Sequence, residues 1–258
     1  MKKVVKFGGS SLASAEQFKK VGEIIHAEKS RRYVVPSAPG KRFPKDTKVT
    51  DMLYDCYEAA GTMDITGKLN AIAQRYQEII DGLGLEVSLE EEFAKIKTAF
   101  EEHVGSDYAA SRGEYLNGII MAAYLEYEFI DAADVVRFDE DGVFDPEVTN
   151  KIMKKRLEGV ERAVIPGFYG ALEDGTIKTF SRGGSDITGS IVARAVCADL
   201  YENWTDVSGF LVTDPHIVED PETIETITYR ELRELSYMGA TVLHADAIFP
   251  LRQEGIPI

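Results

Sequence analysis

Short apolar runs and longer amphipathic stretches alternate along this chain. Apolar runs of strand length occupy residues 3–5, 33–35, 163–165 and 200–204. Between the first two, the periodicity of residues 15–29 predicts a helix. A strand, a helix and a second strand in this order predict a parallel pair of strands. The pattern therefore predicts an α/β domain.

Helical periodicity dominates the middle third of the sequence. Two segments each carry one apolar face, formed by Leu69, Ile72, Ala73, Tyr76, Ile79 and Ile80 in the first and by Leu89, Phe93, Ile96 and Phe100 in the second. We interpret both faces as core packing and assign no chemistry to these helices. A further helix is predicted from Ser111 to about residue 129, with residues 111–114 in its first turn.

The remaining third mixes strand, turn and helix signals. The first signals predict a strand at 133–138, a turn at 139–142, a helix after Pro146 and a hairpin turning at 173–175. A helix is predicted after residue 186, and another that contains Leu232, Leu235 and Met238. Residues 254–258 read as the entry to a strand, where we expect the chain to be cut short.

The charge balance limits the kinds of partner. The chain has 258 residues, 44% of them hydrophobic, which suits one ordinary domain. Its 29 basic and 44 acidic residues give a net charge of −15, and this field repels nucleic acids and anionic membranes. Any anion-binding site must therefore be a local gathering of positive groups.

The cysteines and the amino terminus indicate the compartment. Cys56 and Cys197 are far apart in sequence and match no metal-binding spacing, which predicts a reduced protein without disulfide bonds. No apolar signal segment and no run of membrane-spanning length are present. We therefore expect a cytoplasmic protein.

Two glycine-bearing junctions between a strand and a helix are candidate anion sites. In the first, Lys6-Phe7-Gly8-Gly9-Ser10-Ser11, glycines let backbone N–H groups approach an oxyanion and Lys6 adds a positive charge. Taken alone, this string is equally typical of a plain tight turn. The second junction, 181–186, carries Arg182. Two such junctions could serve a polyphosphate and a second anionic group.

Two other segments add candidate residues. Residues 111–114 read Ser-Arg-Gly-Glu, and a charged cluster at a helix start is often only a cap, although its glycine suggests close approach by a ligand. The basic segment 41–48 lies between a Pro- and Gly-rich loop and a helix that starts near Thr50. Such a loop can cover a site.

The motifs together resemble one family. The chain lacks the phosphate loop, the dinucleotide glycine pattern and the protein-kinase set. Its segments 6–11, 111–114, 181–186, 204–207 and 238–244 instead occur in the order and spacing of aspartate kinases. The chain resembles the catalytic domain of these enzymes, which are members of the amino-acid kinase family.

The resemblance implies a fold and an activity. The fold would be a three-layer α/β/α sandwich around a mainly parallel sheet, with residues 1–258 as one catalytic domain. The amino acid would bind the N-terminal half and ATP the C-terminal half. The reaction would transfer the γ-phosphoryl of ATP to the side-chain carboxylate of L-aspartate, the first step of lysine, threonine and methionine biosynthesis. Mg²⁺ and a homodimer are expected, and the regulatory ACT domains common in the family are absent from this sequence.

The resemblance also implies roles for single residues. Lys6 would bind the transferring phosphoryl group, with the N–H groups of Gly8, Gly9 and Ser10 around it. Arg182 would hold a carboxylate of aspartate, and Glu114 would pair with its ammonium group.

Further hydroxyl and carboxylate groups complete the implied site. Ser37, Thr50 and Ser185 are candidate ligands of substrate or phosphate. Asp186 would either bind Mg²⁺ or hold Lys6 in place. The nucleotide loops would include Thr205, Asp206 and Asp214.

Three positions depart from the family pattern. Thr241 replaces a lysine that contacts ATP in many members, and Leu211 and His216 replace a tyrosine and an arginine near the nucleotide. These departures leave the aspartate half intact and the exact ATP contacts open. Two alternatives to an aspartate kinase remain, namely another amino-acid or carbamate kinase of the same fold and a regulator that binds nucleotide or amino acid without catalysis.

Overall fold

Five parallel strands form the central sheet, in the order β3-β4-β2-β1-β7. The computed structural model describes residues 1–181, 183–206, 209–213, 218–237, 243 and 245–258. A separate antiparallel hairpin is formed by β5 and β6. The expectation of a parallel sheet and the expectation of a hairpin around residues 173–175 are both confirmed.

Seven strands and a series of helices are present in the described ranges. The strands are β1 (Lys3–Phe7), β2 (Arg31–Pro36), β3 (Glu128–Phe129), β4 (Ala163–Val164), β5 (Tyr169–Ala171), β6 (Ile177–Thr179) and β7 (Leu200–Trp204). The helices are η1, a short 3₁₀ helix (Gly9–Leu12), α1 (Ala15–Ala27), α2 (Val49–Ala59), α3 (Thr66–Leu83), α4 (Glu90–Glu101), α5 (Ser106–Leu125), α6 (Ala132–Val135), α7 (Pro146–Arg156), α8 (Gly184–Ala195), α9 (Tyr229–Tyr237) and α10 (Ala245–Glu254).

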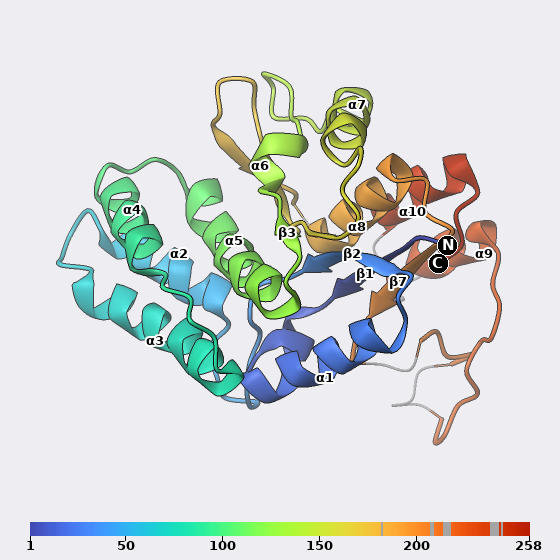
Figure 1. Ribbon diagram of the computed structural model, residues 1–258, viewed down its shortest axis with the longest axis horizontal. Helices are drawn as coiled ribbons and strands as arrows, with labels where there is room; N and C mark the ends of the chain where they lie inside the picture. The colour runs from blue at the N-terminus through green and yellow to red at the C-terminus, as the bar shows by residue number, and fades with distance from the viewer. Residues whose placement is uncertain (182, 207–208, 214–217, 238–242, 244) are drawn as a thin grey trace.

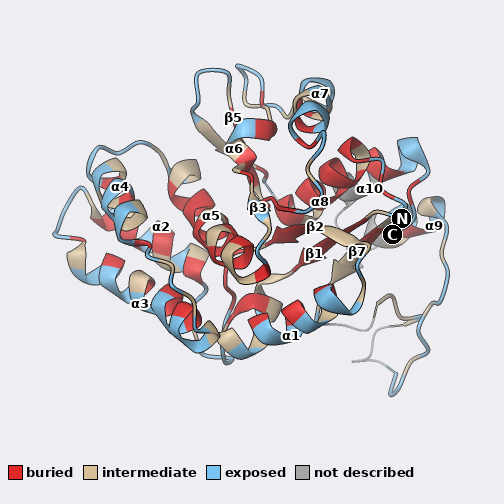
Figure 2. Cartoon of the chain, viewed as in Figure 1, coloured by how far each residue is buried: buried red, intermediate tan, exposed pale blue. Residues whose placement is uncertain are grey.

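The sheet separates two hydrophobic cores because successive side chains of a strand point to opposite faces. Val4, Tyr33 and Val35 pack with α6, α7 and α8 on one face. Val5 and Val34 pack with α1 to α5 on the other. Buried residues accordingly cover both the sheet and the facing sides of the helices (Figure 2). The three-layer α/β/α sandwich is therefore confirmed.

The helices of the two outer layers come from different parts of the chain. In Figure 1, α1 to α5 lie below and to the left of the sheet, whereas α7, α8 and α10 lie above it and to its right. The two predicted apolar faces of the middle third are the core-facing sides of α3 and α4. No helix in the described ranges is both long enough and apolar enough to cross a membrane.

The chain's single tryptophan lies at the end of β7. The Trp204 ring stacks on Phe7 at 6.0 Å between centroids, and the Arg31 guanidinium lies over it at 5.3 Å. Its indole N–H donates to Glu202 at 2.8 Å. The Trp204 carbonyl accepts a hydrogen bond from the Gly8 N–H at 3.3 Å, which ties the ends of β1 and β7 together.

Three predictions about single elements were wrong. Residues 133–138 begin as helix α6, because the Asp131 side chain accepts the Ala133 N–H at 2.9 Å and caps a helix start. Helix α5 starts at Ser106, so residues 111–114 lie beyond its first turn. The expected strand entry at 254–258 is instead the end of α10 and an irregular segment, whose Pro257 carbonyl accepts the Tyr201 N–H at 2.9 Å.

The helix expected around Leu232 is described in part. Helix α9 covers Leu232 and Leu235, so the prediction is confirmed for these two residues. Met238 lies outside the described residues.

Two helical glycines should respond to alanine in opposite directions. A Cβ at Gly189 of α8 would lie 2.5 Å from the Tyr201 hydroxyl oxygen, whereas a Cβ at Gly67 of α3 would meet no atom within 4 Å. We expect Gly189→Ala to lower the free energy of unfolding by about 1–3 kcal/mol through overpacking. We expect Gly67→Ala to raise it by up to about 1 kcal/mol. Urea unfolding midpoints measure both, and equal shifts would contradict the packing of α8 on β7.

Candidate functional site

The loops that come after β1, β2 and β7 meet at one hollow of about 540 Å³. It is lined by Gly9, Ser10, Ala38, Pro39, Gly40, Lys41, Phe43, Pro44, Lys48, Thr50, Glu114 and Asp206. These loops leave the carboxyl ends of parallel strands, which is where open α/β sheets bind ligands. Five predicted site residues therefore share one hollow, namely Gly9, Ser10, Thr50, Glu114 and Asp206.

Three glycines allow the walls of this hollow to approach one another. The Gly40 N–H donates to the Gly9 carbonyl at 2.8 Å, and a Cβ on Gly9 would lie 2.8 Å from the Ala38 carbonyl oxygen. A Cβ on Gly113 would lie 2.8 Å from the Ala38 Cβ. The glycine of the Ser-Arg-Gly-Glu segment therefore makes room for the loop after β2, and the close approach of a ligand at Gly113 stays a prediction.

The first glycine junction differs in detail from the prediction. Gly9 and Ser10 open η1, and α1 starts only at Ala15, where Ser14 caps it by accepting the Gln17 N–H at 3.4 Å. In this structure the Gly8 N–H donates to the Trp204 carbonyl, and the role expected for it at a phosphoryl group stays a prediction. The N–H groups of Gly9 and Ser10, as the first of a helix, have no partner within η1.

Lys6 of β1 forms an ion pair with Asp186 of α8. Lys6 has the same parity as Val4 on β1 and therefore faces α8, whose first turn carries Asp186. The Lys6 Nζ lies 2.7 Å from the Asp186 Oδ1, and the two side chains are only 11% and 14% exposed. Of the two roles considered for Asp186, the contact that holds Lys6 is present in the structure.

Glu114 is a buried carboxylate without a counter-ion among the described residues. Its side chain is 6% exposed, and its Oε2 has no hydrogen-bond partner. Burial raises the pKa of Glu114 to about 8, against the opposing effects of the Ala38 N–H and the charge of Arg112. Arg112 itself is surrounded by tyrosine rings, with its guanidinium 4.5 Å from the centroid of Tyr108 and 4.3 Å from that of Tyr115.

The predicted hydroxyl ligands fall in different places. Thr50 lines the hollow from the first turn of α2. Ser37 holds the loop after β2, because its N–H donates to the Phe7 carbonyl at 3.1 Å and its carbonyl accepts the Asn117 side chain at 2.7 Å. Ser185 is buried in α8, where its side chain leaves no space for a Cβ on Gly167. Ser37 and Ser185 are not among the residues that line the hollow.

The predicted nucleotide residues are only partly described. The Thr205 hydroxyl donates to Asp206 at 3.2 Å, and Asp206 is an exposed member of the hollow already described. Leu211 pairs with Thr223 in an isolated antiparallel bridge. Four predicted site residues lie outside the described residues, namely Arg182, Asp214, His216 and Thr241.

Sequence reasoning missed Phe168, which packs against the second junction. Its φ of 80° is unusual for a side chain of this size, and its N–H donates to the Thr188 hydroxyl at 3.1 Å. Its ring leaves no space for a Cβ on Gly184. A Pro-Gly-Phe segment shortly after β4 was the available signal. The loop residues Lys41, Phe43 and Lys48 were noted as a possible cover but not as individual wall residues.

A second hollow lies beside β7 in the C-terminal part of the chain. Its volume is about 610 Å³, and its lining includes the apolar side chains of Phe210, Ile224, Ile227 and Leu232. Asn203 also lines it, and its buried side-chain oxygen has no hydrogen-bond partner among the residues that the structure describes. This hollow can therefore accept a flat apolar group together with a hydrogen-bond donor.

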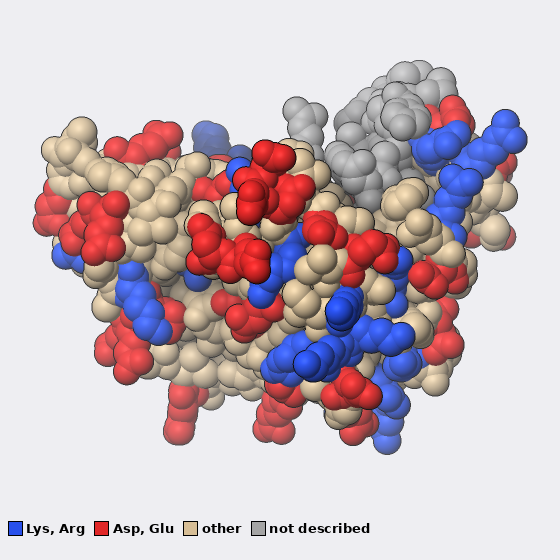
Figure 3. Space-filling view, turned by 90° about the horizontal axis from the view of Figure 1, so that it is seen from above, with Lys and Arg blue, Asp and Glu red and all other residues tan. Residues whose placement is uncertain are grey.

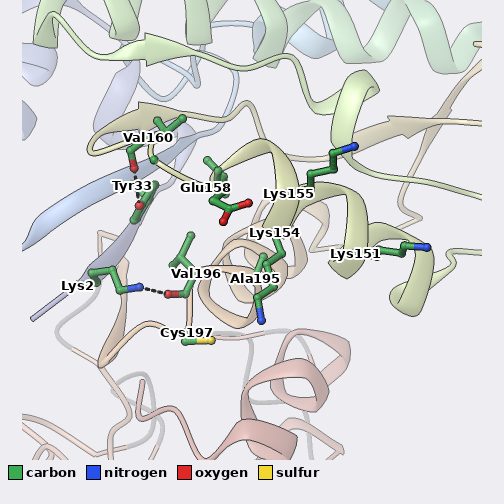
Figure 4. A pocket seen from close by; sticks show the side chains of 12 residues that line it. Lys2, Tyr33, Lys151, Lys154, Lys155, Glu158, Val160, Ala195, Val196 and Cys197 are labelled. Carbon is green, nitrogen blue, oxygen red and sulfur yellow. Dashed lines mark hydrogen bonds between the residues drawn. The ribbon is translucent and has the colours of Figure 1, made fainter.

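A third hollow, of about 630 Å³, lies at the opposite end of the sheet. It is lined by Lys2, Tyr33 and Val160 at or near the starts of strands and by Lys151, Lys154 and Lys155 of α7 (Figure 4). The α7 lysines point in different directions rather than toward one centre, and no predicted site residue is present. Figure 3 shows basic side chains gathered in one area of a face that is otherwise rich in acidic groups.

Neither metal-ligating side chains nor cysteines form clusters in the described part of the chain. No group of three or more His, Cys, Asp or Glu side chains there could hold a metal ion. Cys56 and Cys197 are free thiols, as predicted, and burial raises the pKa of Cys56 to about 11.

Comparison with known proteins identifies the family. The model of the amino acid kinase family matches residues 1–258, and the chain belongs to this family. It is 40% identical to aspartokinase 3 of Bacillus subtilis (strain 168), covering 99% of this chain and 60% of that relative.

Solved structures agree with the sequence relatives. Aspartate kinase of Clostridium acetobutylicum is 53% identical, with a TM-score of 0.92 over 99% of this chain and 58% of that one. Aspartokinase III of E. coli in complex with aspartate and ADP is 25% identical, with a TM-score of 0.83 over 98% of this chain and 60% of that one. The chain thus spans about three fifths of the length of these relatives.

The stability of the chain should depend on pH through Glu114. Folding raises the pKa of Glu114 from 4.5 to about 8, so the folded state holds a proton that the unfolded state releases, and stability falls as pH rises through this window. We expect Glu114→Gln to stabilise the chain at pH 8 by on the order of 2–5 kcal/mol, from about 1.4 kcal/mol per pKa unit, and to have little effect near pH 4.5. Urea unfolding at both pH values measures this. Equal effects at the two pH values would show that the charge of Glu114 is not the cause.

Proposed function

We propose that this chain is the catalytic domain of an aspartate kinase, which transfers the γ-phosphoryl of ATP to the side-chain carboxylate of L-aspartate and forms 4-phospho-L-aspartate. The observation that carries the proposal is the buried Glu114, which has no counter-ion in the described part of the chain and shares a hollow with Gly9 and Ser10. The relatives named aspartokinase, one of them solved with aspartate and ADP, support it.

Glu114 suits an acceptor with a free ammonium group. A carboxylate buried without a counter-ion is costly, and an ammonium placed beside it would restore its charged form. Lys41 and Lys48 line the same hollow and supply the positive charge that a dicarboxylate requires. An acylated amino group or a carbamate has no cation to offer Glu114, so the hollow favours a free amino acid.

Lys6 suits the transferring phosphoryl group. Phosphoryl transfer needs little covalent chemistry from a protein and depends on alignment and on neutralising charge over the phosphoryl oxygens. Asp186 holds the Lys6 ammonium in one position, and the Gly9 and Ser10 N–H groups lie on the loop directly after β1. In this proposal Lys6 stabilises the transition state as a fixed point charge.

Asp186 is also the described residue that fits Mg²⁺. This ion typically binds one or two carboxylates together with substrate phosphates and keeps several waters. When bound, it would supply further neutralisation of phosphate charge. The apolar hollow beside β7 offers space for the base of the nucleotide. The cytoplasmic location expected from the cysteines and the amino terminus and the homodimer expected from the resemblance belong to the same proposal.

The choice of acceptor tests the proposal directly. We expect release of ADP from ATP and Mg²⁺ when L-aspartate is present, and little release with glutamate, N-acetylglutamate or carbamate at equal concentration. A coupled assay of ADP gives the rates. Turnover with one of the other acceptors alone would place the chain elsewhere in the family, and ATP binding without any transfer would favour a regulator.

Lys3 provides a control for the role of Lys6, because both lysines belong to β1. Lys3 and Lys6 both form buried ion pairs, but Lys3 pairs with Glu28 and Glu202, away from the hollow. We expect Lys6→Met to reduce kcat on the order of 10²–10³-fold, the effect typical of removing one charge-stabilising donor. We expect Lys3→Met to lower thermal stability with kcat retained. Steady-state kinetics and thermal unfolding measure the two effects, and comparable kcat values for both variants would refute the assigned role.

A further inference from the structure

Arg75 of α3 reaches the loop that forms one wall of the hollow shared by Gly9 and Glu114. Its side chain is only 6% exposed. Its Nη2 donates to the Gly40 carbonyl at 3.0 Å and its Nη1 to the Thr47 carbonyl at 3.1 Å. The Nη1 also lies 3.1 Å from the Asp46 Oδ2. One guanidinium therefore binds both ends of the segment 40–48.

A second arginine strengthens this attachment from the outside. Arg42 donates to Asp46 through Nε at 2.9 Å and through its backbone N–H at 3.0 Å, and these bonds hold the pKa of Asp46 well below its usual range. Arg42 also pairs with Glu78 of α3 at 3.0 Å. Asp46 is therefore charged at neutral pH, and it compensates the buried guanidinium of Arg75.

The two carbonyls that Arg75 binds belong to residues that shape the hollow. Gly40 is the residue whose N–H bonds the Gly9 carbonyl, and Thr47 lies shortly before Thr50 of α2. The segment between these two residues carries three side chains of the lining, namely Lys41, Phe43 and Pro44, and Lys48 follows directly after it. Fixing the two ends of this segment sets the position of its lining side chains.

The next residue of α3 supports the opposite wall. The Tyr76 hydroxyl donates to the Gly113 carbonyl at 2.7 Å, directly before Glu114. Adjacent residues of one helix thus contact both the loop after β2 and the part of α5 that carries Glu114. Arg75 does not itself line the hollow.

We propose that Arg75 is a positioning residue for the amino-acid acceptor, holding segment 40–48 as the wall of the acceptor hollow. The proposal rests on the proposed function and deepens it. Loss of Arg75 loosens this wall while Lys6, Asp186 and the hollow beside β7 keep their contacts. The expected result is weaker binding of aspartate, with ATP binding and the chemical step retained.

Kinetics of the whole chain test this proposal. We expect Arg75→Met to raise the KM for aspartate by about tenfold or more, in line with the cost of misplacing a positioning group, with kcat and the KM for ATP changed by less than about threefold. Ile79→Ala is the matched control, because Ile79 is buried on the core face of the same helix. It should lower thermal stability without changing the ratio of the two KM values.

Hydrogen exchange provides a readout that does not depend on activity. Amides of segment 40–48 should exchange faster in Arg75→Met than in Ile79→Ala at matched temperature below unfolding. Asp46→Asn should shift exchange and the KM for aspartate in the same direction, and its effect should not add to that of Arg75→Met. If Arg75→Met does not fold, Asp46→Asn alone decides the question. Arg75→Lys should rescue only in part, since an ammonium lacks the planar fork that bridges two carbonyls.

Two results would overturn the proposal. The first is an equal rise of the KM values for aspartate and ATP in Arg75→Met, or in Asp46→Asn where Arg75→Met does not fold. The second is unchanged exchange of segment 40–48 in the variant used. Failure of the proposed function is a separate result, seen as absence of aspartate-dependent ADP release by the unmodified chain. In that case the exchange experiment still tests whether Arg75 holds the segment.

Discussion

The close approach of two backbone segments at Gly9 and Gly40 is the constraint on which the site depends. A Cβ on Gly40 would lie 2.6 Å from the Gly9 carbonyl carbon, so neither residue tolerates a side chain without movement. Because the loops after β1 and β2 touch here, Ser10 and the basic segment 41–48 face the same hollow. Gly113 extends this arrangement by letting α5 approach Ala38, which brings Glu114 to the opposite wall. Glu114 is buried and has no counter-ion among the described residues. Arg112 beside it packs on tyrosine rings and donates to the Ser111 hydroxyl rather than to a carboxylate. A small molecule that carries both an ammonium and carboxylates matches this pattern better than a simple anion does.

Much of the fold could be predicted because local patterns determine it. The strand-helix-strand order predicted an α/β domain, and the apolar faces of α3 and α4 predicted helices packed on a core. The three-layer arrangement was expected from the resemblance to aspartate kinases. Residues 133–138 were misread because their alternation competes with the cap that Asp131 provides, and a side-chain cap of this kind is weakly visible in sequence. The start of α5 was missed for a different reason, since its first turn lacks a capping side chain.

Site residues that belong to short sequence motifs could be predicted. Residues that act through contacts with segments distant in the sequence could not. Lys6, Gly9 and Glu114 could be selected from short motifs, and Gly9 and Glu114 line one hollow. Arg75 could not, because its partners stand 28 to 35 residues earlier and only the fold brings them to α3. The burial that shifts the pKa of Glu114 is likewise a property of the packed α5 and not of its own segment.

The position of Trp204 gives the molecule a built-in optical reporter. It is the single tryptophan, so the indole emission of the chain arises from one place. Trp204 lies at the end of β7, where this strand pairs with β1, and Thr205 follows it directly. The Trp204 carbonyl accepts a hydrogen bond from the Gly8 N–H. The indole is in contact with Arg31 and Glu202, both of which alter the electric field at the ring. Any rearrangement that separates the glycine junction from the end of β7 therefore changes the protein's own fluorescence.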